Sequence, residues 1–143
     1  MESSIRPLKN NKYKQMKFST DKHEKYVVLK LDEPKFTNDN TPALKSEFIL
    51  LNTEGYRNIV LDLSAVKECN DSQDLSCLLV GDRLCKSAGG VFIVTGVNNS
   101  IANIIKMSNL HQSVTFVNKL DEATDLIFME EIEKELRGSV DKG

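Results

Sequence analysis

The sequence is poor in the residues that build most catalytic and metal sites. Its 143 residues include no tryptophan, two histidines and three cysteines. Cys69, Cys77 and Cys85 are odd in number and lack CxxC spacing, which argues against a disulfide scaffold and favours a reducing compartment. Cys77 and Cys85 lie more than two turns apart on one expected helix, too far to chelate one ion. We therefore predict that the cysteines are small buried hydrophobic side chains.

Long hydrophobic runs and an excess of either charge are also missing. The longest apolar runs, such as 59–61 and 91–94, fall far short of the ~20 residues that span a bilayer. No apolar segment typical of a secretion signal follows the basic N-terminus. Nineteen Lys and Arg residues against 21 Asp and Glu residues give a net charge of −2, which argues against nucleic-acid binding driven by bulk charge. We expect a cytoplasmic protein with no nucleic-acid or membrane partner.

Familiar catalytic motifs are absent as well. The sequence contains no GxGxxG, GxxxxGK[ST], HExxH or GxSxG pattern. Neither His23 nor His111 has an obvious carboxylate or thiol partner in the sequence, and no nucleophile–base pair can be named. We therefore expect no catalytic residue, no metal and no cofactor. Binding of a small ligand or nucleotide at a helix end, after Thr95-Gly96 or within 70–74, is an alternative that the lack of a glycine-rich loop disfavours.

Strand and helix patterns alternate along the rest of the chain. β-Branched and apolar runs predict strands at 16–20, 26–31, 58–63, 91–95 and 114–117. Apolar residues at helical spacing predict helices from 40 or 41 to 55, from 75 to 88, from about 98 to 107, and from 120 to 136. Such alternation predicts parallel pairing, and the N-terminal hairpin makes the sheet mixed. The predicted fold is α/β, a mixed sheet of four to five strands covered by about four helices in the order β-β-α-β-α-β-α-β-α.

Two short segments flank the predicted domain at 16–137. Residues 1–15 carry more basic than acidic side chains and few apolar ones. We interpret them as a flexible basic arm or as an artefact of the assigned start site. Residues 138–143 are predicted to be a disordered tail.

One loop between a buried strand and a helix concentrates polar side chains. Its sequence is Cys69-Asn70-Asp71-Ser72-Gln73-Asp74. The amino end of a helix carries unpaired N–H groups and positive dipole, and ligands and partners usually bind at this edge of an α/β sheet. An ordinary helix cap made by Ser72 or Asp71 explains the same pattern without any function.

Several segments in register resemble the STAS domain family. They are Ile59–Val66, Asp71-Ser72, Leu75–Gly81, Ala88–Val94, Asn109-Leu110-His111 and Phe116–Ala123. The resemblance covers about residues 16–128 and, more narrowly, is to the single-domain bacterial anti-sigma factor antagonists. The element order predicted above from hydrophobic patterning agrees with the STAS order independently.

The resemblance implies a regulatory binding protein and not an enzyme. In that family a serine of an Asp-Ser-Ser-Gly loop is phosphorylated by a serine kinase that is also the anti-sigma factor. The unphosphorylated antagonist binds this kinase and frees the sigma factor, and a serine phosphatase reverses the modification. A phosphate adds about −1.5 to −2 charge at pH 7, enough to switch affinity at a contact surface. The resemblance also implies a monomer.

The loop departs from the family motif where the phosphate is added. It carries one extra residue, and Gln73 replaces the glycine of the motif. If the turn needs a positive φ at this position, glutamine adopts that conformation only at a cost in free energy. Ser72 is its only hydroxyl side chain and is our phosphorylation candidate. Three interpretations are open: Ser72 is still phosphorylated, the site is inactive and binding is constitutive, or Asp71 partly mimics a phosphate. Gln73 and Asp74 could instead extend the helix by part of a turn.

The resemblance also implies a surface that binds the partner. Its centre is the loop residues Asn70, Asp71, Ser72, Gln73 and Asp74. Around it we expect Asp82 and Arg83 on the exposed side of the following helix, and Thr37 and Asn38 in the neighbouring loop. The alternative function is a degenerate STAS scaffold that is not phosphorylated.

Overall fold

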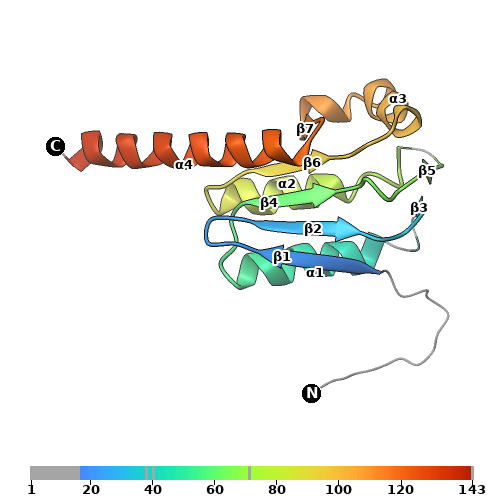
Figure 1. Ribbon diagram of the computed structural model, residues 1–143, viewed down its shortest axis with the longest axis horizontal. Helices are drawn as coiled ribbons and strands as arrows, with labels where there is room; N and C mark the ends of the chain where they lie inside the picture. The colour runs from blue at the N-terminus through green and yellow to red at the C-terminus, as the bar shows by residue number, and fades with distance from the viewer. Residues whose placement is uncertain (1–16, 38, 40, 71, 143) are drawn as a thin grey trace, which may run out of the picture.

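The computed structural model describes residues 17–37, 39, 41–70 and 72–142 (Figure 1). Within them, five strands form one sheet in the order β1-β2-β4-β6-β7. These strands are β1 (Phe18–Lys22), β2 (Val27–Leu31), β4 (Ile59–Asp62), β6 (Phe92–Thr95) and β7 (Thr115–Val117). β1 and β2 pair antiparallel, and the other neighbours pair parallel. The predicted mixed sheet with an N-terminal hairpin is confirmed.

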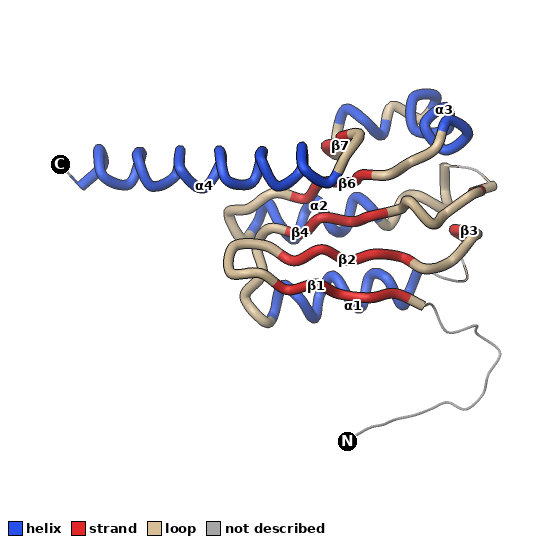
Figure 2. Tube along the Cα trace, viewed as in Figure 1, coloured by secondary structure: helices blue, strands red, loops and turns tan. Residues whose placement is uncertain are grey.

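Helices cover both faces of this sheet (Figure 2). They are α1 (Thr41–Thr53), α2 (Leu78–Ser87), α3 (Asn99–Met107) and α4 (Leu120–Lys142), and a short 3-10 helix spans Leu110–Gln112. Side chains of α1, α2 and α3 share one hydrophobic core with the sheet, whereas α4 packs on the opposite face. The predicted fold class and its four helices are therefore confirmed.

The core follows from the alternation of side chains along buried strands. On β2, Val27 and Leu29 face the larger core, whereas Val28 faces the smaller core under α4. Strands covered on both faces need apolar residues at every position, which explains the continuous runs in β4 and β6. Fully buried side chains of the larger core include Leu29, Leu44, Phe48, Ile59, Leu61, Phe92 and Val94.

A second, two-stranded sheet escaped prediction. β3 (Lys35–Phe36) pairs parallel with β5 (Glu68–Cys69), with Phe36 opposite Cys69. The backbone N–H groups of residues 67 and 68 also donate to the carbonyl of Pro34, at 2.8 and 3.1 Å. We predicted loops for both segments because two residues are too few to show a period.

The start of α3 carries the predicted cap, whereas the cap that Ser72 was expected to make for α2 is absent, because α2 begins after Cys77 without a side-chain cap. The side chain of Asn98 accepts a hydrogen bond from the backbone N–H of Ile101 at 2.9 Å and so caps α3. Gly55, with φ of +106°, follows α1, and Gly89, with φ of +84°, follows α2. Asn40, one of the two residues at which we predicted α1 to begin, lies outside the described residues.

The last helix is longer than predicted. We expected it to end at Leu136 and residues 138–143 to be disordered, but α4 continues through Gly138 to Lys142. One glycine inside a helix costs only about 1 kcal/mol. An ion pair between Glu133 and Arg137, at 3.2 Å and one turn apart, supports the turn just before it. The predicted arm at 1–15 lies outside the described residues.

Candidate functional site

The predicted loop lies where the parallel strands end, between β5 and α2 (Figure 1). Asp74 is 4% exposed, and its carboxylate accepts a hydrogen bond from the backbone N–H of Asn70 at 2.9 Å. The Cys69 sulfur lies 4.0 Å from the same carboxylate. Asp74 therefore ties the backbone of Asn70 to the end of the loop. It does so as a buried structural group, not as part of the exposed surface that we expected.

The loop enters α2 through turns of the 3-10 type. The N–H groups of Leu75, Ser76 and Leu78 donate to the carbonyls three residues earlier, at 3.0–3.2 Å. α2 itself begins at Leu78, later than the predicted Leu75. Gln73 lies in these turns and does not extend α2, so the alternative in which Gln73 and Asp74 lengthen the helix is wrong. Among the described residues only Asn109 combines a side chain with a positive φ, so Gln73 carries no left-handed strain. The expected cost of replacing glycine is absent.

Ser72 is exposed beside a groove that runs toward α3. The groove has a volume of about 370 Å³, and its lining residues are Asn70, Ser72, Ile104, Met107 and Ser108. Met107 is 84% exposed, although we predicted it among the apolar residues of its helix. Helical geometry sets Met107 well away from the buried Ile101 and Ile105, and this spacing was the available signal. The structure thus adds an apolar side chain next to the phosphorylation candidate.

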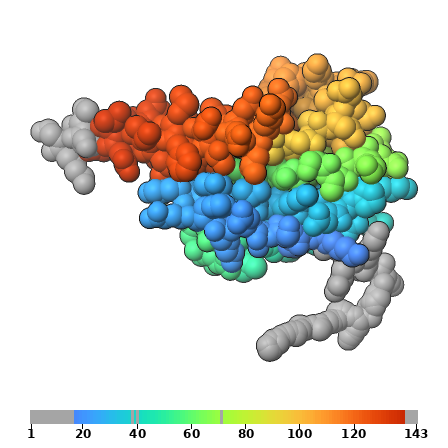
Figure 3. All heavy atoms as spheres, viewed as in Figure 1, coloured from blue at the N-terminus to red at the C-terminus, as the bar shows by residue number. Residues whose placement is uncertain are grey.

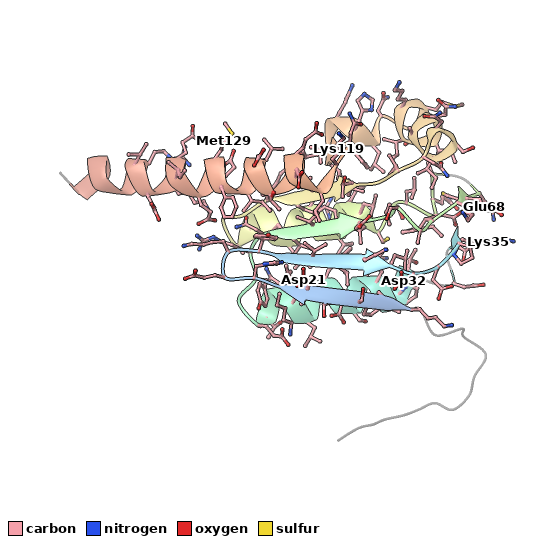
Figure 4. All side chains as sticks on the ribbon, viewed as in Figure 1. Asp21, Asp32, Lys35, Glu68, Lys119 and Met129 are labelled. Carbon is pink, nitrogen blue, oxygen red and sulfur yellow. The ribbon has the colours of Figure 1, made fainter. Side chains whose placement is uncertain are left out.

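The small sheet brings the neighbouring loop to this site. Because Phe36 pairs with Cys69, Thr37 follows directly alongside Asn70. Lys35 and Glu68, which are in register, lie side by side at this edge (Figure 4). The side chain of Asn98 donates to the carbonyl of Lys67 at 2.8 Å and ties the start of α3 to the same region. Three segments that are far apart in the sequence therefore converge at this site. Two residues of the predicted surface, Asn38 and Asp71, lie outside the described residues.

Only one of the two residues predicted on α2 is exposed. Arg83 faces solvent. Asp82 is 7% exposed, and its carboxylate pairs with the Lys86 ammonium at 2.9 Å. It lies on the buried side of α2 with Leu78 and Cys85, so the expectation that Asp82 belongs to an exposed surface is wrong.

The described side chains offer little nucleophilic or metal chemistry. Burial raises the pKa of both Cys77 and Cys85 to about 12, so these thiols stay protonated at neutral pH. Cys69 is only half-buried, whereas we predicted that it is buried. In the described part of the chain, no group of three or more His, Cys, Asp or Glu side chains could hold a metal ion. His23 does have a partner, since its Nε2 lies 2.9 Å from the Asp21 carboxylate on the exposed β1–β2 hairpin.

A second hollow lies between α3 and β7. Its volume is about 440 Å³, and its lining residues are Val97, Ala102, Ile105, Lys106, His111, Phe116, Val117 and Asn118. His111 is exposed. Most of the lining is apolar, and Lys106 and His111 supply the basic groups. The hollow therefore suits a small apolar ligand better than a nucleotide.

None of the helices in residues 17–142 that the structure describes is long and apolar enough to cross a membrane.

Comparison with known proteins gives a family and a set of similar folds. The sequence pattern of the STAS domain matches residues 17–123. A comparison with curated protein sequences gives no match. Similar solved structures include a candidate anti-sigma factor antagonist of Thermotoga maritima, with 24% identity, a TM-score of 0.66, and coverage of 77% of this chain and 93% of that one.

Two further structures share the fold. An anti-sigma factor antagonist of Mycobacterium paratuberculosis has 20% identity and a TM-score of 0.68, with coverage of 78% of this chain and 93% of that one. The Bacillus cell fate determinant SpoIIAA in its phosphorylated form has 15% identity and a TM-score of 0.58, with coverage of 78% and 99%. At these identities the likeness is one of fold.

Proposed function

Because the chain belongs to the STAS domain family, we propose that it is a non-catalytic regulatory protein that acts as an anti-sigma factor antagonist. It binds an anti-sigma factor of the serine-kinase type. Phosphorylation of Ser72 by that kinase ends the binding, and a serine phosphatase restores it. The observation that carries this proposal is the exposed Ser72 beside a groove that displays the 84% exposed Met107.

The geometry supports this switch in two steps. Met107, together with the half-buried Ile104, offers a partner an apolar contact, and such contacts near the centre of an interface dominate its affinity. A phosphate on Ser72 would bring about −1.5 to −2 charge to the same groove at pH 7. A partner that covers Met107 would then have to desolvate that charge, which is costly without a cationic group to pair with it.

Hydrogen bonds on either side of Asp71 support the same proposal. Asp74 holds the backbone of Asn70, and the 3-10 turns hold residues 72–78. Residues that are already hydrogen-bonded in the free protein lose less conformational entropy when a partner binds. Ser72 is exposed at the start of these turns, although Gln73 stands where the family motif has glycine.

Intact-mass analysis of the protein purified by affinity from its own cells tests this function. We expect a mass gain of one phosphate and a co-purifying ATPase of the serine-kinase type. Ser72→Ala should abolish the mass gain. Ser76→Ala is the matched control, because Ser76 is also exposed, one turn later, and its hydroxyl donates to the Gln73 carbonyl at 2.9 Å.

Other outcomes of that experiment identify the alternatives. An unmodified protein that still retains the kinase would indicate constitutive binding or a scaffold role. If neither kinase nor phosphate is found, the antagonist function is wrong and only the fold stands.

The hollow between α3 and β7 supports a second candidate function, the binding of a small apolar ligand with an anionic group. Its apolar walls would contact the ligand, and Lys106 and His111 would face the anion. Titration with decanoate, followed by NMR, should shift signals of Phe116 and Val117. Ile105→Trp, which fills the hollow, should remove the shifts, and shifts that persist in this variant would contradict the site.

A further inference from the structure

α3 forms a wall of two separate cavities. From α3, the groove beside Ser72 is lined by Ile104, Met107 and Ser108. From the same helix, the hollow toward β7 is lined by Ala102, Ile105 and Lys106. We refer to these cavities as the Ser72 groove and the α3–β7 hollow. Because a helix with its side chains is about 10–12 Å in diameter, a ligand in the hollow would lie within about one helix diameter of the surface that we assign to the partner.

α3 depends on tertiary packing for its position. It has nine residues, and an isolated helix of that length is marginally stable at best in water. Ile101 and Ile105 anchor it in the core, at 0% and 4% exposure. On the flank toward β7, the hollow of about 440 Å³ replaces close packing. At this corner of the molecule (Figures 1 and 3), we therefore expect α3 to open locally at a lower free-energy cost than the central strands.

α3 is joined to the Ser72 loop by direct contacts. It packs against β5, whose last residue, Cys69, directly precedes Asn70 of the loop. Just before β5, the carbonyl of Lys67 accepts a hydrogen bond at 2.8 Å from the side chain of Asn98, which caps α3. A change in how firmly α3 is held therefore reaches both walls of the Ser72 groove.

The walls of the α3–β7 hollow suit an aliphatic chain. Ile105, Phe116 and Val117 contribute to its lining, which is mostly apolar. Its volume of about 440 Å³ is within the range of about 300–1,000 Å³ that is usual for small-molecule sites. An aliphatic ligand would bury these side chains and supply the contacts that α3 lacks on this flank.

The charged groups of the hollow favour an anionic headgroup. Lys106 and His111 belong to the lining and are exposed. Two acidic side chains, Asp121 and Glu122, follow in the first turn of α4, but neither lines the hollow. The Glu122 carboxylate accepts a hydrogen bond from the backbone N–H of Asn118 at 2.9 Å. The lining itself is therefore basic, and Lys106 can pair with one anionic group.

We propose that an aliphatic carboxylate bound in the α3–β7 hollow stabilises α3 and thereby raises the affinity of the Ser72 groove for the partner. This proposal rests on the antagonist function and on the ligand site proposed above. The ligand orders α3 before the partner arrives, so less conformational entropy is lost when the partner binds. By reciprocity, the bound partner raises the affinity of the hollow for the carboxylate by the same factor.

Amide hydrogen exchange, followed by NMR on the full chain during titration with decanoate, tests the effect on α3. A ligand that binds only while α3 is closed slows exchange through local opening by the factor 1 + [L]/Kd, which is about elevenfold at ten times the Kd. We expect this slowing for the backbone N–H groups of Ile105 and Met107. Amides of β1 that exchange by local opening are the internal control and should keep their rates, because β1 and β7 lie at opposite edges of the sheet.

Ala102→Leu tests whether decanoate acts in the hollow. Ala102 is half-buried in the lining, so the added carbon atoms fill part of the cavity from α3 itself. Exchange of α3 should be slow in this variant without decanoate, and decanoate should slow it little further. Leucine does not exceed alanine in helix propensity, so propensity alone cannot produce this result. Asn103→Leu, at the exposed next position, is the matched control and should behave as the wild type.

Lys106→Gln tests the recognition of the carboxylate. Loss of one exposed ion pair should raise the dissociation constant of decanoate about two- to fivefold. Lys45→Gln, at an exposed position on α1, is the control and should leave the constant unchanged. Equal affinities of the wild type and Lys106→Gln would overturn the placement of the anionic group.

Calorimetric titration with the co-purified kinase, with and without saturating decanoate, tests the regulation. We expect decanoate to raise the affinity about fivefold or more in the wild type and to have little effect in Ala102→Leu. Equal affinities with and without decanoate would overturn the regulation and leave the antagonist function intact. A chain that binds no kinase would contradict the antagonist function itself. Exchange of α3 that decanoate does not slow, or slows equally in Ala102→Leu, would overturn the ligand site whether or not the kinase binds.

Discussion

At the amino edge of the sheet Asn58 and Glu131 are buried and bonded to each other, whereas at the carboxyl edge Ser72 faces solvent. Asn58, which is 1% exposed, donates to the Lys25 carbonyl and to the Glu131 carboxylate, at 2.9 and 2.8 Å, and accepts from the Val91 N–H at 2.9 Å. Arg57 donates twice to Glu131. These bonds join the starts of β2 and β6 to α4.

The carboxyl edge uses its polar residues differently. Asp74 satisfies the backbone of its own loop, and Ser72 and Met107 are left on the surface. The difference teaches where function can reside in this fold. Buried groups at the amino edge are committed to each other and contribute to stability, whereas exposed groups at the carboxyl edge can change partner without unfolding the protein.

The largest effect on stability is expected at the amino edge, from Asn58→Ala. This change removes three hydrogen bonds and leaves the Val91 N–H without its partner, so it should lower the free energy of unfolding by about 3 kcal/mol. Urea denaturation would measure it. Asn103→Ala, at an exposed position on α3, is the control and should change stability by less than about 0.5 kcal/mol. Equal losses in both variants would contradict the importance of the buried network.

A smaller effect, which depends on pH, is expected from Glu131→Gln. The hydrogen bonds from Arg57 lower the pKa of the Glu131 carboxyl below its ordinary value of 4.5, and the Asn58 amide acts in the same direction against the effect of burial. Because folding lowers this pKa, ionised Glu131 contributes its full stabilisation at pH values above the pKa that the carboxyl has in the unfolded chain. The stabilisation is lost as the pH falls through the lower pKa of the folded protein.

Unfolding curves of the wild type and Glu131→Gln between pH 7 and pH 3 check this prediction. At pH 7 the variant should be less stable by about 1–3 kcal/mol, because one charge-assisted contact is lost. The difference should shrink below about pH 4.5 as the wild-type carboxyl becomes protonated. A difference that stays constant over this range would show that the charge of Glu131 contributes nothing.

The smallest effect on stability, yet a clear effect on binding, is expected at the carboxyl edge from Met107→Ser. Because Met107 is 84% exposed, the free energy of unfolding should change by less than about 0.5 kcal/mol. Affinity for the anti-sigma partner should fall about tenfold or more if Met107 anchors the interface. Calorimetric titration with the co-purified kinase would measure this. Leu50→Ser on α1, at 50% exposure, is the control. A similar loss of affinity in this variant would contradict the assignment of partner binding to the carboxyl edge.

The sequence by itself determined the elements whose signals are local. Apolar runs in β4 and β6 specified buried strands, because a chain segment covered on both faces needs apolar residues at each position. Asn98 specified a helix start, because a cap bonds only to the next turn. The family resemblance likewise rested on segments that are each continuous in the chain, and the only hydroxyl of the loop, Ser72, could be named from them.

Only the tertiary structure decided the contacts between distant segments. Asn58 and Glu131 are 73 residues apart, and no period in either region points to the other. The burial of Asp82 depends on which side of α2 meets the sheet, and we placed it on the wrong side, whereas the exposure of Met107 could have been inferred from its spacing to Ile101 and Ile105. β3 and β5 exist only because two loops meet. Periodicity relates residues within a few turns, whereas these contacts are set by the packing of whole elements, which the three-dimensional fold alone specifies.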